Sequence, residues 1–252
     1  MGQVPVANIT ERLVKLSEGQ LAMLNGIVDT FLQEVSATRR DDSDVVSPQF
    51  LDAFGDILKL HHSLSNDYLD KHRFEAAMER VYRVLGVDAH RPNRNNPGHD
   101  LSVGGVPWSL KTQGDNGIKL DFLHISKFME MGKGKWETES DLPGLRDRFI
   151  QHMLAYQRIF QLRYFRLEAT QLMLHSHYYE LVEIPKSLLL QAQDFECVMS
   201  HSSKQNPKPG YCTVTKDGIV SFRLYFDGGS ERKLQIKDIR KSLCIVHATW
   251  EF

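Results

Sequence analysis

An aspartate and a lysine, Asp100 and Lys111, stand eleven residues apart near the middle of the chain. Hydrolysis of a phosphodiester needs a divalent cation that polarises the phosphoryl oxygen and lowers the pKa of an attacking water. It also needs a positive charge near the negative charge that develops in the transition state. A neighbouring carboxylate and lysine meet both needs, although the same pair at this spacing also arises by chance in unrelated proteins. The elements that position the two residues therefore decide between these interpretations.

A β-hairpin would bring these two side chains together. Residues 100–103 and 106–111 are predicted strands, and Gly104-Gly105 between them is a two-residue hairpin signal. Because a two-residue turn places the ends of its strands side by side, we expect Asp100 and Lys111 to be neighbours. The backbone carbonyl of Leu110 should then face the same cation, and Mg²⁺ prefers one or two carboxylates, carbonyls and water.

The first ninety residues are predicted to be mainly helical. Ser17-Glu18-Gly19-Gln20 has the form of a capping box, and the apolar residues behind it recur at helical spacing. Residues 39–44 are a predicted loop, after which Ser47-Pro48 begins a second helix. A third helix is expected from about Asp67 to Leu85, ended by Gly86.

Helices and strands are expected to alternate after Lys111. We predict a short helix near His124–Met131, a long helix from Asp141 to about Arg163, and a short helix at 185–193. The predicted strands of this part are 164–167, 179–184, 218–226, 233–236 and 243–250, with a turn at 227–229. The sequence shows no internal repeat.

Composition is that of an ordinary globular protein, with 41% hydrophobic and 25% charged residues in 252. Since no apolar run approaches the roughly 20 residues that span a bilayer, no membrane segment is expected. The N-terminal sequence lacks the apolar core of a signal peptide, and three widely spaced cysteines indicate reduced thiols. We therefore expect a cytoplasmic protein.

Charge is distributed unevenly along the chain. Residues 201–252 carry nine Lys and Arg against five Asp and Glu, whereas residues 1–100 carry eleven bases against fifteen acids. A net charge of −1 argues against a histone-like, purely electrostatic DNA binder, but local basic patches can still contact phosphates. Recognition by shape and base edges would fit better.

Two polar segments are candidates for reading DNA, because Arg, Lys, Asn and Gln make most contacts to base edges. The first is the loop before Asp100, and the second precedes and includes the basic C-terminal hairpin. The candidate DNA-binding residues are Arg91, Arg94, Asn95, Asn96, Lys204, Gln205, Lys208 and Arg232, with Lys133 as a phosphate contact. For each residue, a solvated loop is the alternative interpretation.

The run NNPGHDLSVGGVPWSLKT, residues 95–112, resembles the active-site segment of type II restriction endonucleases of the PD-(D/E)XK superfamily. Further blocks resemble one such enzyme family, which cuts CCCGGG, in the same order along residues 50–252. These blocks are HISKFMEMGKGKW, LRYF, YELVEIPKSLLL, SKQNPKPGY, YFDGGSERKLQIK and CIVHATW. The first forty residues match only loosely.

The resemblance implies a catalytic site with Mg²⁺ as cofactor. Asp100 and Glu75 are the implied metal ligands and Lys111 the implied catalytic lysine. Position 109, where the superfamily pattern has a second carboxylate, holds Ser109, so the charge has to come from the preceding helix. Glu75 fits that place better than Glu79, and a solvated helix face is the alternative for both. Gln113 stands where a further carboxylate is expected, which weakens a second metal site.

The resulting prediction is an α/β restriction-endonuclease-like fold, a central mixed sheet flanked by helices with a helical N-terminal region. We expect a single endonuclease unit, 1–252, with a helical subregion 1–65, a catalytic core 66–195 and a β-rich basic subregion 196–252. The expected activity is Mg²⁺-dependent, in-line hydrolysis of double-stranded DNA at a GC-rich palindrome such as CCCGGG. A homodimer is expected because protein symmetry then mirrors site symmetry, and a cognate DNA methyltransferase is the implied functional partner.

Two alternatives remain open at this stage. A repair or mobile-element nuclease could use the same core with little sequence preference. A non-catalytic DNA-binding descendant could have lost cleavage together with the carboxylate at position 109. The first would cut any DNA, and the second would bind DNA in Mg²⁺ and leave it intact.

Overall fold

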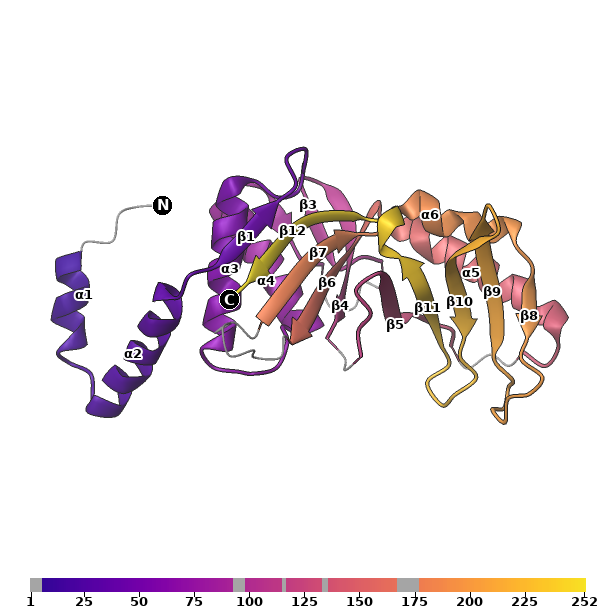
Figure 1. The fold of residues 1–252 in the computed structure, drawn as a ribbon, viewed down its shortest axis with the longest axis horizontal. Coiled ribbons are helices and arrows are strands. Elements are labelled where there is room, and N and C mark those ends of the chain that lie inside the picture. Colours follow the sequence, from indigo (N-terminus) through magenta and orange to yellow (C-terminus); the bar gives the residue numbers. More distant parts are fainter. Residues whose placement is uncertain (1–5, 93–97, 115–116, 133–135, 167–176) are drawn as a thin grey trace.

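The structure, a computed structural model, describes residues 6–92, 98–114, 117–132, 136–166 and 177–252. Its strands form two sheets, of seven and five strands, and each sheet has its own helices (Figure 1). Each sheet also has its own apolar core. The mixed α/β architecture confirms the predicted fold class.

The two N-terminal helices, α1 (Val6–Leu13) and α2 (Glu18–Leu32), project from the rest of the chain as an arm (Figure 1). The predicted capping box is confirmed, since the Ser17 hydroxyl accepts from the Gln20 N–H and the Gln20 side chain accepts from the Ser17 N–H. No described side chain of α2 is buried. The apolar stripe of this helix therefore exists, but most of it is left exposed.

Helices α3 (Pro48–His62) and α4 (Lys71–Val84) pack on one face of the seven-stranded sheet. The Ser47 side chain caps α3 and Asp70 caps α4, each by accepting a backbone N–H. Gly86 has a φ of 78°, as the predicted helix end requires. Buried Phe54 and Phe74 contact each other edge to face at 6.2 Å between the two helices.

The seven-stranded sheet has the order β1-β12-β7-β6-β4-β3-β2. Its strands are β1 (Ser36–Arg39), β2 (Ala89–His90), β3 (Leu101–Val103), β4 (Val106–Gln113), β6 (Arg158–Arg166), β7 (His177–Glu183) and β12 (Ile245–Glu251). All neighbours are antiparallel except β4 and β6, which are parallel. The sheet is therefore mixed, as predicted.

The five-stranded sheet is antiparallel throughout and has the order β5-β11-β10-β9-β8. Its strands are β5 (Phe122–Glu130), β8 (Cys197–Met199), β9 (Gly210–Lys216), β10 (Ile219–Phe226) and β11 (Lys233–Arg240). Helices α5 (Leu142–His152) and α6 (Lys186–Leu190) pack against it. Short 3-10 turns occupy Glu139–Asp141, Met153–Ala155, Gln191–Asp194 and Lys241–Leu243.

Three predictions of secondary structure were wrong. The helix expected near His124–Met131 is strand β5, which pairs with β11 more than one hundred residues later. The helix expected to reach Arg163 ends at His152, and β6 begins at Arg158. The loop predicted at 39–44 was placed one residue too early, because Arg39 is the last residue of β1, which pairs with β12.

A buried ion pair lies where the two sheets adjoin. The guanidinium of Arg163 on β6 is 2.6 Å from the carboxylate of Glu180 on β7, and both side chains are almost fully buried. Arg163 also donates to the backbone carbonyls of Lys119 and Phe122, on the segment that enters β5. Because β12 returns to the seven-stranded sheet after β11, the two sheets share the C-terminal part of the chain.

Within the described ranges, no helix combines the length and the apolar character needed to cross a membrane. The three cysteines are free thiols.

Candidate active site

The hairpin formed by β3 and β4 carries the two residues that opened the sequence analysis. Its turn, Gly104-Gly105, has φ angles of 56° and 79°, which glycine adopts without steric cost. The Asp100 N–H donates to the Trp108 carbonyl at 2.9 Å, which extends the strand pairing to Asp100. As expected from the hairpin, Lys111 Nζ lies 3.5 Å from Asp100 Oδ2.

The Asp100 carboxylate is held on both of its oxygens. Oδ2 accepts from the Leu110 N–H at 2.7 Å and from the Ser109 hydroxyl at 3.1 Å, and Oδ1 accepts from Lys71 Nζ at 2.8 Å. Burial by itself would raise the pKa of this carboxyl, but the charges of Lys111 and Lys71 lower it more. Asp100 is therefore ionised at neutral pH.

Lys111 is surrounded by protein, with only 10% of its side chain exposed. Its ammonium lies 5.7 Å from the centre of the Phe128 ring. Burial lowers the pKa of Lys111, and the attraction of Asp100 opposes this shift. A lysine with a lowered pKa can exchange a proton more readily than a solvated one.

Helix α4 turns Glu75 toward Asp100, because its neighbours Phe74 and Met78 are buried against the sheet. The Glu75 side chain is 12% exposed, and its carboxylate lies 3.4 Å from Lys71 Nζ. Glu79, one turn later, is instead bonded to the backbone and side chain of Arg91. Of the two glutamates weighed from the sequence, Glu75 is therefore the one beside Asp100.

Asp100 and Glu75 converge on one cation position. The single ammonium of Lys71 lies within ion-pair distance of both carboxylates, so one metal ion could contact both. In a strand the N–H and C=O of one residue point to the same side, so the Leu110 carbonyl faces Asp100. No group of three or more His, Cys, Asp and Glu side chains gathers as a metal site among the described residues. Two carboxylates and a carbonyl nevertheless suit Mg²⁺, which retains several waters.

Ser109 and Gln113 replace expected carboxylates and have structural partners instead. Ser109 is 2% exposed, and its hydroxyl orients Asp100. The Gln113 side-chain carbonyl accepts from the His124 N–H at 3.3 Å and from Arg163 at 3.4 Å. Gln113 thus connects β4 to β5 and β6.

The first group of predicted DNA-binding residues falls mainly outside the described part of the chain. Arg94, Asn95, Asn96 and Lys133 belong to the ranges 93–97 and 133–135, about which the structure is silent. Arg91 is described, and its guanidinium lies 2.7 Å from Glu79.

The second group lies at one end of the five-stranded sheet, on the loops β8–β9 and β10–β11 (Figure 1). The Gln205 side chain donates to Asp227 at 3.2 Å, which brings the two loops together. Lys208 donates to the backbone carbonyl of His201, Lys204 is exposed, and Arg232 has a φ of 42°. The structure thus groups these residues with one another, on the sheet that does not carry Asp100.

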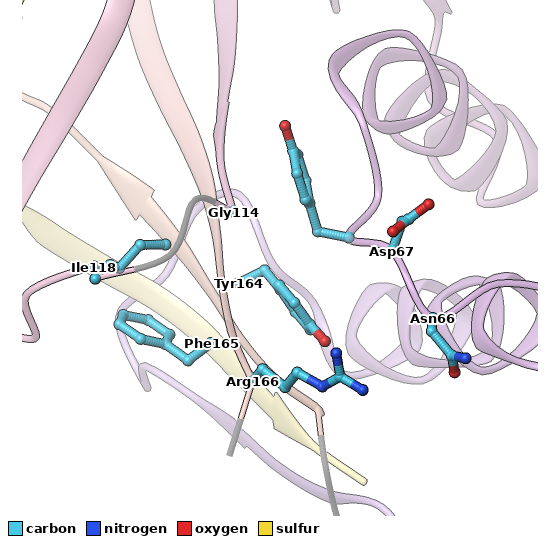
Figure 2. A pocket seen from close by; sticks show the side chains of 9 residues that line it. Asn66, Asp67, Gly114, Ile118, Tyr164, Phe165 and Arg166 are labelled. Carbon is cyan, nitrogen blue, oxygen red and sulfur yellow. The ribbon is translucent and has the colours of Figure 1, made fainter. Parts of the chain in front are cut away.

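Sequence reasoning missed two features near the hairpin. Lys71 contacts both carboxylates, and its spacing of four residues from Glu75 was the available signal. A cavity of about 340 Å³ also opens where β4 and β6 end, with Tyr164, Arg166 and Asp67 around it (Figure 2). A Cβ on Gly114 would lie 2.2 Å from the Tyr68 ring, so this wall requires glycine.

Comparisons with known proteins identify the family of the chain. A family model described as SmaI, type II site-specific deoxyribonuclease, matches residues 9–252. The type II restriction enzyme SmaI of Serratia marcescens is 42% identical over 216 residues, which cover 85% of this chain and 84% of that protein. No solved structure matches. Type II restriction enzymes generally use a divalent metal ion. The chain belongs to the SmaI family of type II site-specific deoxyribonucleases.

Proposed function

We propose that this restriction endonuclease cuts both strands of a GC-rich palindrome, CCCGGG with blunt ends, as the family resemblance suggests. The observation that carries the catalytic part is the convergence of Asp100 and Glu75 on one cation position, with Lys111 beside them. The whole chain acts as one endonuclease unit, because Arg163 and β12 connect the two sheets.

The proposed cofactor is Mg²⁺, held by the carboxylates of Asp100 and Glu75 and the carbonyl of Leu110. When bound, Mg²⁺ supplies polarisation of the scissile phosphate and a lower pKa for the attacking water. Ser109 and the Leu110 N–H hold the Asp100 carboxylate in one orientation. With those bonds in place, Asp100 needs no rearrangement when the cation arrives.

Lys111 has two proposed tasks. Its ammonium places positive charge where negative charge develops on the phosphate. Since burial lowers its pKa, Lys111 can also accept a proton from the attacking water. The products are a 5′-phosphate and a 3′-hydroxyl.

DNA contacts are proposed for two surfaces. The β8–β9 loop, which carries Lys204, Gln205 and Lys208, is basic and lies beside the β10–β11 loop, which carries Arg232. Arg91, Arg94, Asn95, Asn96 and Lys133 are proposed to contact DNA nearer the hairpin. Arg91 would have to exchange its Glu79 partner for DNA.

The enzyme is proposed to act as a homodimer, because two active sites are needed for the two strands of a palindrome. The α2 arm is the proposed contact with the second copy. Its side chains Met23, Val28 and Leu32 are 66%, 51% and 77% exposed. Lys59 on α3 is buried and donates to the carbonyls of Phe31 and Gln33, which anchors the arm in its outward direction. While Lys59 holds the arm in this direction, the exposed apolar side chains of α2 cannot fold back against the rest of the same chain.

A restriction enzyme must be kept from the DNA of its own cell. We therefore propose action in the cytoplasm beside a cognate methyltransferase that modifies the same site.

Plasmid digestion tests the proposed specificity. The purified protein is incubated with Mg²⁺ and a plasmid of known sequence that contains CCCGGG sites, and the fragment ends are sequenced. We expect discrete fragments with blunt ends at CCCGGG and no cleavage of a matched plasmid whose sites are mutated. Discrete ends at another sequence would refute the proposed site, and a smear would refute site specificity.

Substitution tests the proposed ligands separately. Asp100→Asn and Glu75→Gln should each abolish cleavage while DNA binding, measured by gel shift without metal, persists. Glu79→Gln is the matched control on the same helix, one turn away, and should still cleave. Full activity of Asp100→Asn would contradict the assignment of the site.

A further inference from the structure

Lys71 lies at the point where the two proposed metal ligands meet. Its Nζ is 2.8 Å from Asp100 Oδ1 and 3.4 Å from the Glu75 carboxylate. We propose that Lys71 is a built-in counter-cation, which occupies the metal position of the metal-free enzyme and has to leave it when Mg²⁺ binds. This inference rests on the proposed function, because it takes Asp100 and Glu75 as the metal ligands.

The two oxygens of Asp100 have different partners. Oδ2 is bonded to the Leu110 N–H and the Ser109 hydroxyl and faces Lys111. Among the described residues, Lys71 is the one that donates a hydrogen bond to Oδ1 and forms an ion pair with it. Oδ1 is therefore the oxygen that is open to an incoming cation, and Lys71 is what such a cation would displace.

Lys71 can leave more easily than Lys111. Its side chain is 41% exposed, whereas that of Lys111 is 10% exposed and covered by Phe128. The exposed stem can rotate into solvent without opening a cavity. Lys111 has no such path, so it stays beside the carboxylate in both states.

Helix stability does not explain a lysine at this position. Lys71 is the first residue of α4, and the positive end of the helix dipole disfavours a cation there. Glu75, four residues later, offsets part of this effect, but in the less favourable order with the lysine first. The two carboxylates are the partners that make the position favourable.

Displacement has a consequence for DNA binding. Once Mg²⁺ takes Asp100 and Glu75, the released ammonium is at the surface beside the catalytic hairpin, where it can pair with a DNA phosphate. DNA and Mg²⁺ then favour the same state of Lys71, and by linkage each increases the affinity for the other.

Titration with Mg²⁺ alone tests the proposal without relying on cleavage. Binding to the full-length protein is measured by calorimetry in the absence of DNA, for the wild type, Lys71→Met and Arg73→Met. Arg73 is an exposed cation on the same helix and contacts Asp70 rather than the two carboxylates. We expect Lys71→Met to bind Mg²⁺ about tenfold more tightly than the wild type, and Arg73→Met to match the wild type.

A melting experiment supplies a second reading and checks folding. In EDTA, Lys71→Met should melt below the wild type, because its two carboxylates then have only Lys111 to offset their mutual repulsion. Saturating Mg²⁺ should close this gap. Lys71→Arg retains a cation and should behave like the wild type in both experiments.

The outcomes separate the two proposals. Equal or weaker Mg²⁺ binding by Lys71→Met, with binding abolished by Asp100→Asn, would refute the role of Lys71 and leave the metal site in place. Binding that Asp100→Asn does not change would refute the metal site itself, and the role of Lys71 with it.

Discussion

The seven-stranded and five-stranded sheets differ in what their buried positions hold. Among the described residues, the buried polar side chains of the seven-stranded sheet are Ser102, Ser109, Lys111, Gln113, Gln161, Arg163, Glu180 and His247. The five-stranded sheet buries Ser221, and its other buried side chains are apolar, such as Phe222, Leu224 and Ile236. Both sheets are covered by helices, so the difference does not arise from exposure.

Burying a charge is unfavourable unless the charge is paired and hydrogen-bonded. The seven-stranded sheet satisfies this condition with two clusters, Asp100 with Lys111 and Arg163 with Glu180. The first cluster is the proposed catalytic site, and the second holds the entry to β5. The proposed catalytic site and the inter-sheet ion pair thus both lie in the seven-stranded sheet, while the five-stranded sheet has a mainly apolar core and carries the β8–β9 and β10–β11 loops.

The largest expected effect is on catalysis. Lys111→Met should lower the cleavage rate by about 10³-fold, because both the positive charge and the proton acceptor are lost. The matched control is Lys237→Met on β11, a half-buried lysine that lies 3.6 Å above the Tyr225 ring. Rates are measured with saturating enzyme in a single turnover. A comparable loss of cleavage rate in Lys237→Met would show that the effect is not specific to Lys111, and it would contradict the placement of catalysis in the seven-stranded sheet.

The next effect is on stability. Arg163→Met should lower the free energy of unfolding by about 3–5 kcal/mol, because it leaves Glu180 buried with one fewer partner. Arg223→Met on β10 breaks a partly exposed pair with Asp238 and should cost only about 0–1 kcal/mol. Urea denaturation measures both. Similar losses in the two variants would mean that burial does not distinguish the pairs.

Apolar truncation tests the five-stranded sheet. Leu224→Ala should lower the free energy of unfolding by about 2–5 kcal/mol, because the fully buried side chain leaves a cavity. The cleavage rate per folded molecule should stay at the wild-type level, since Leu224 packs in the core of the five-stranded sheet and the proposed catalytic residues lie in the other sheet. Denaturation and single-turnover rates below the transition check the two parts. A loss of rate in fully folded protein would show that this sheet takes part in catalysis.

A smaller effect concerns pH. Burial lowers the pKa of His62 to about 3 and that of His177 to about 4, and the two rings stack 3.7 Å apart beside β7. Both rings are therefore neutral in the folded state at pH values where the unfolded chain takes up protons. Their contribution to stability is fully present above a pH of about 6.5 and is lost as the pH falls toward 4.

Melting temperature against pH measures this contribution. His62→Gln should reduce the loss between pH 6.5 and 4 by on the order of 1–2 kcal/mol, after allowance for solvent screening. The pH dependence of stability that remains in His62→Gln is then due to His177 and to carboxylates. An unchanged slope in His62→Gln would contradict the assignment.

Local signals predicted the elements whose determinants lie within a few residues. The capping box at Ser17, the Pro48 start of α3 and the Gly104-Gly105 turn each depend on neighbouring backbone groups, and each is confirmed. The same turn predicted the proximity of Asp100 and Lys111, because a two-residue turn fixes which residues of the two strands pair with each other. The roles of these residues in cleavage stay a prediction.

Strands β5 and β6 could not be recognised in this way. β6 is buried from Ile159 to Tyr164 because it lies between β4 and β7. Its alternation of Phe160, Leu162 and Tyr164 with polar residues follows directly on the helical spacing of the segment before it, so local pattern did not show where the helix ends. β5 is a strand because β11 pairs with it, and local spacing does not record so distant a partner.

The sequence by itself determined the Gly104-Gly105 hairpin, the capped starts of α2 and α3, and the family. Only the tertiary structure decided that Glu75 faces Asp100 while Glu79 binds Arg91, and that Ser109, at the position of the expected second carboxylate, orients Asp100. It also placed Lys71 between the two acids. The reason is physical: a hairpin or a cap is formed by residues that are neighbours in the chain. The site joins a helix to a hairpin more than twenty residues away, and packing alone sets which side chains meet there.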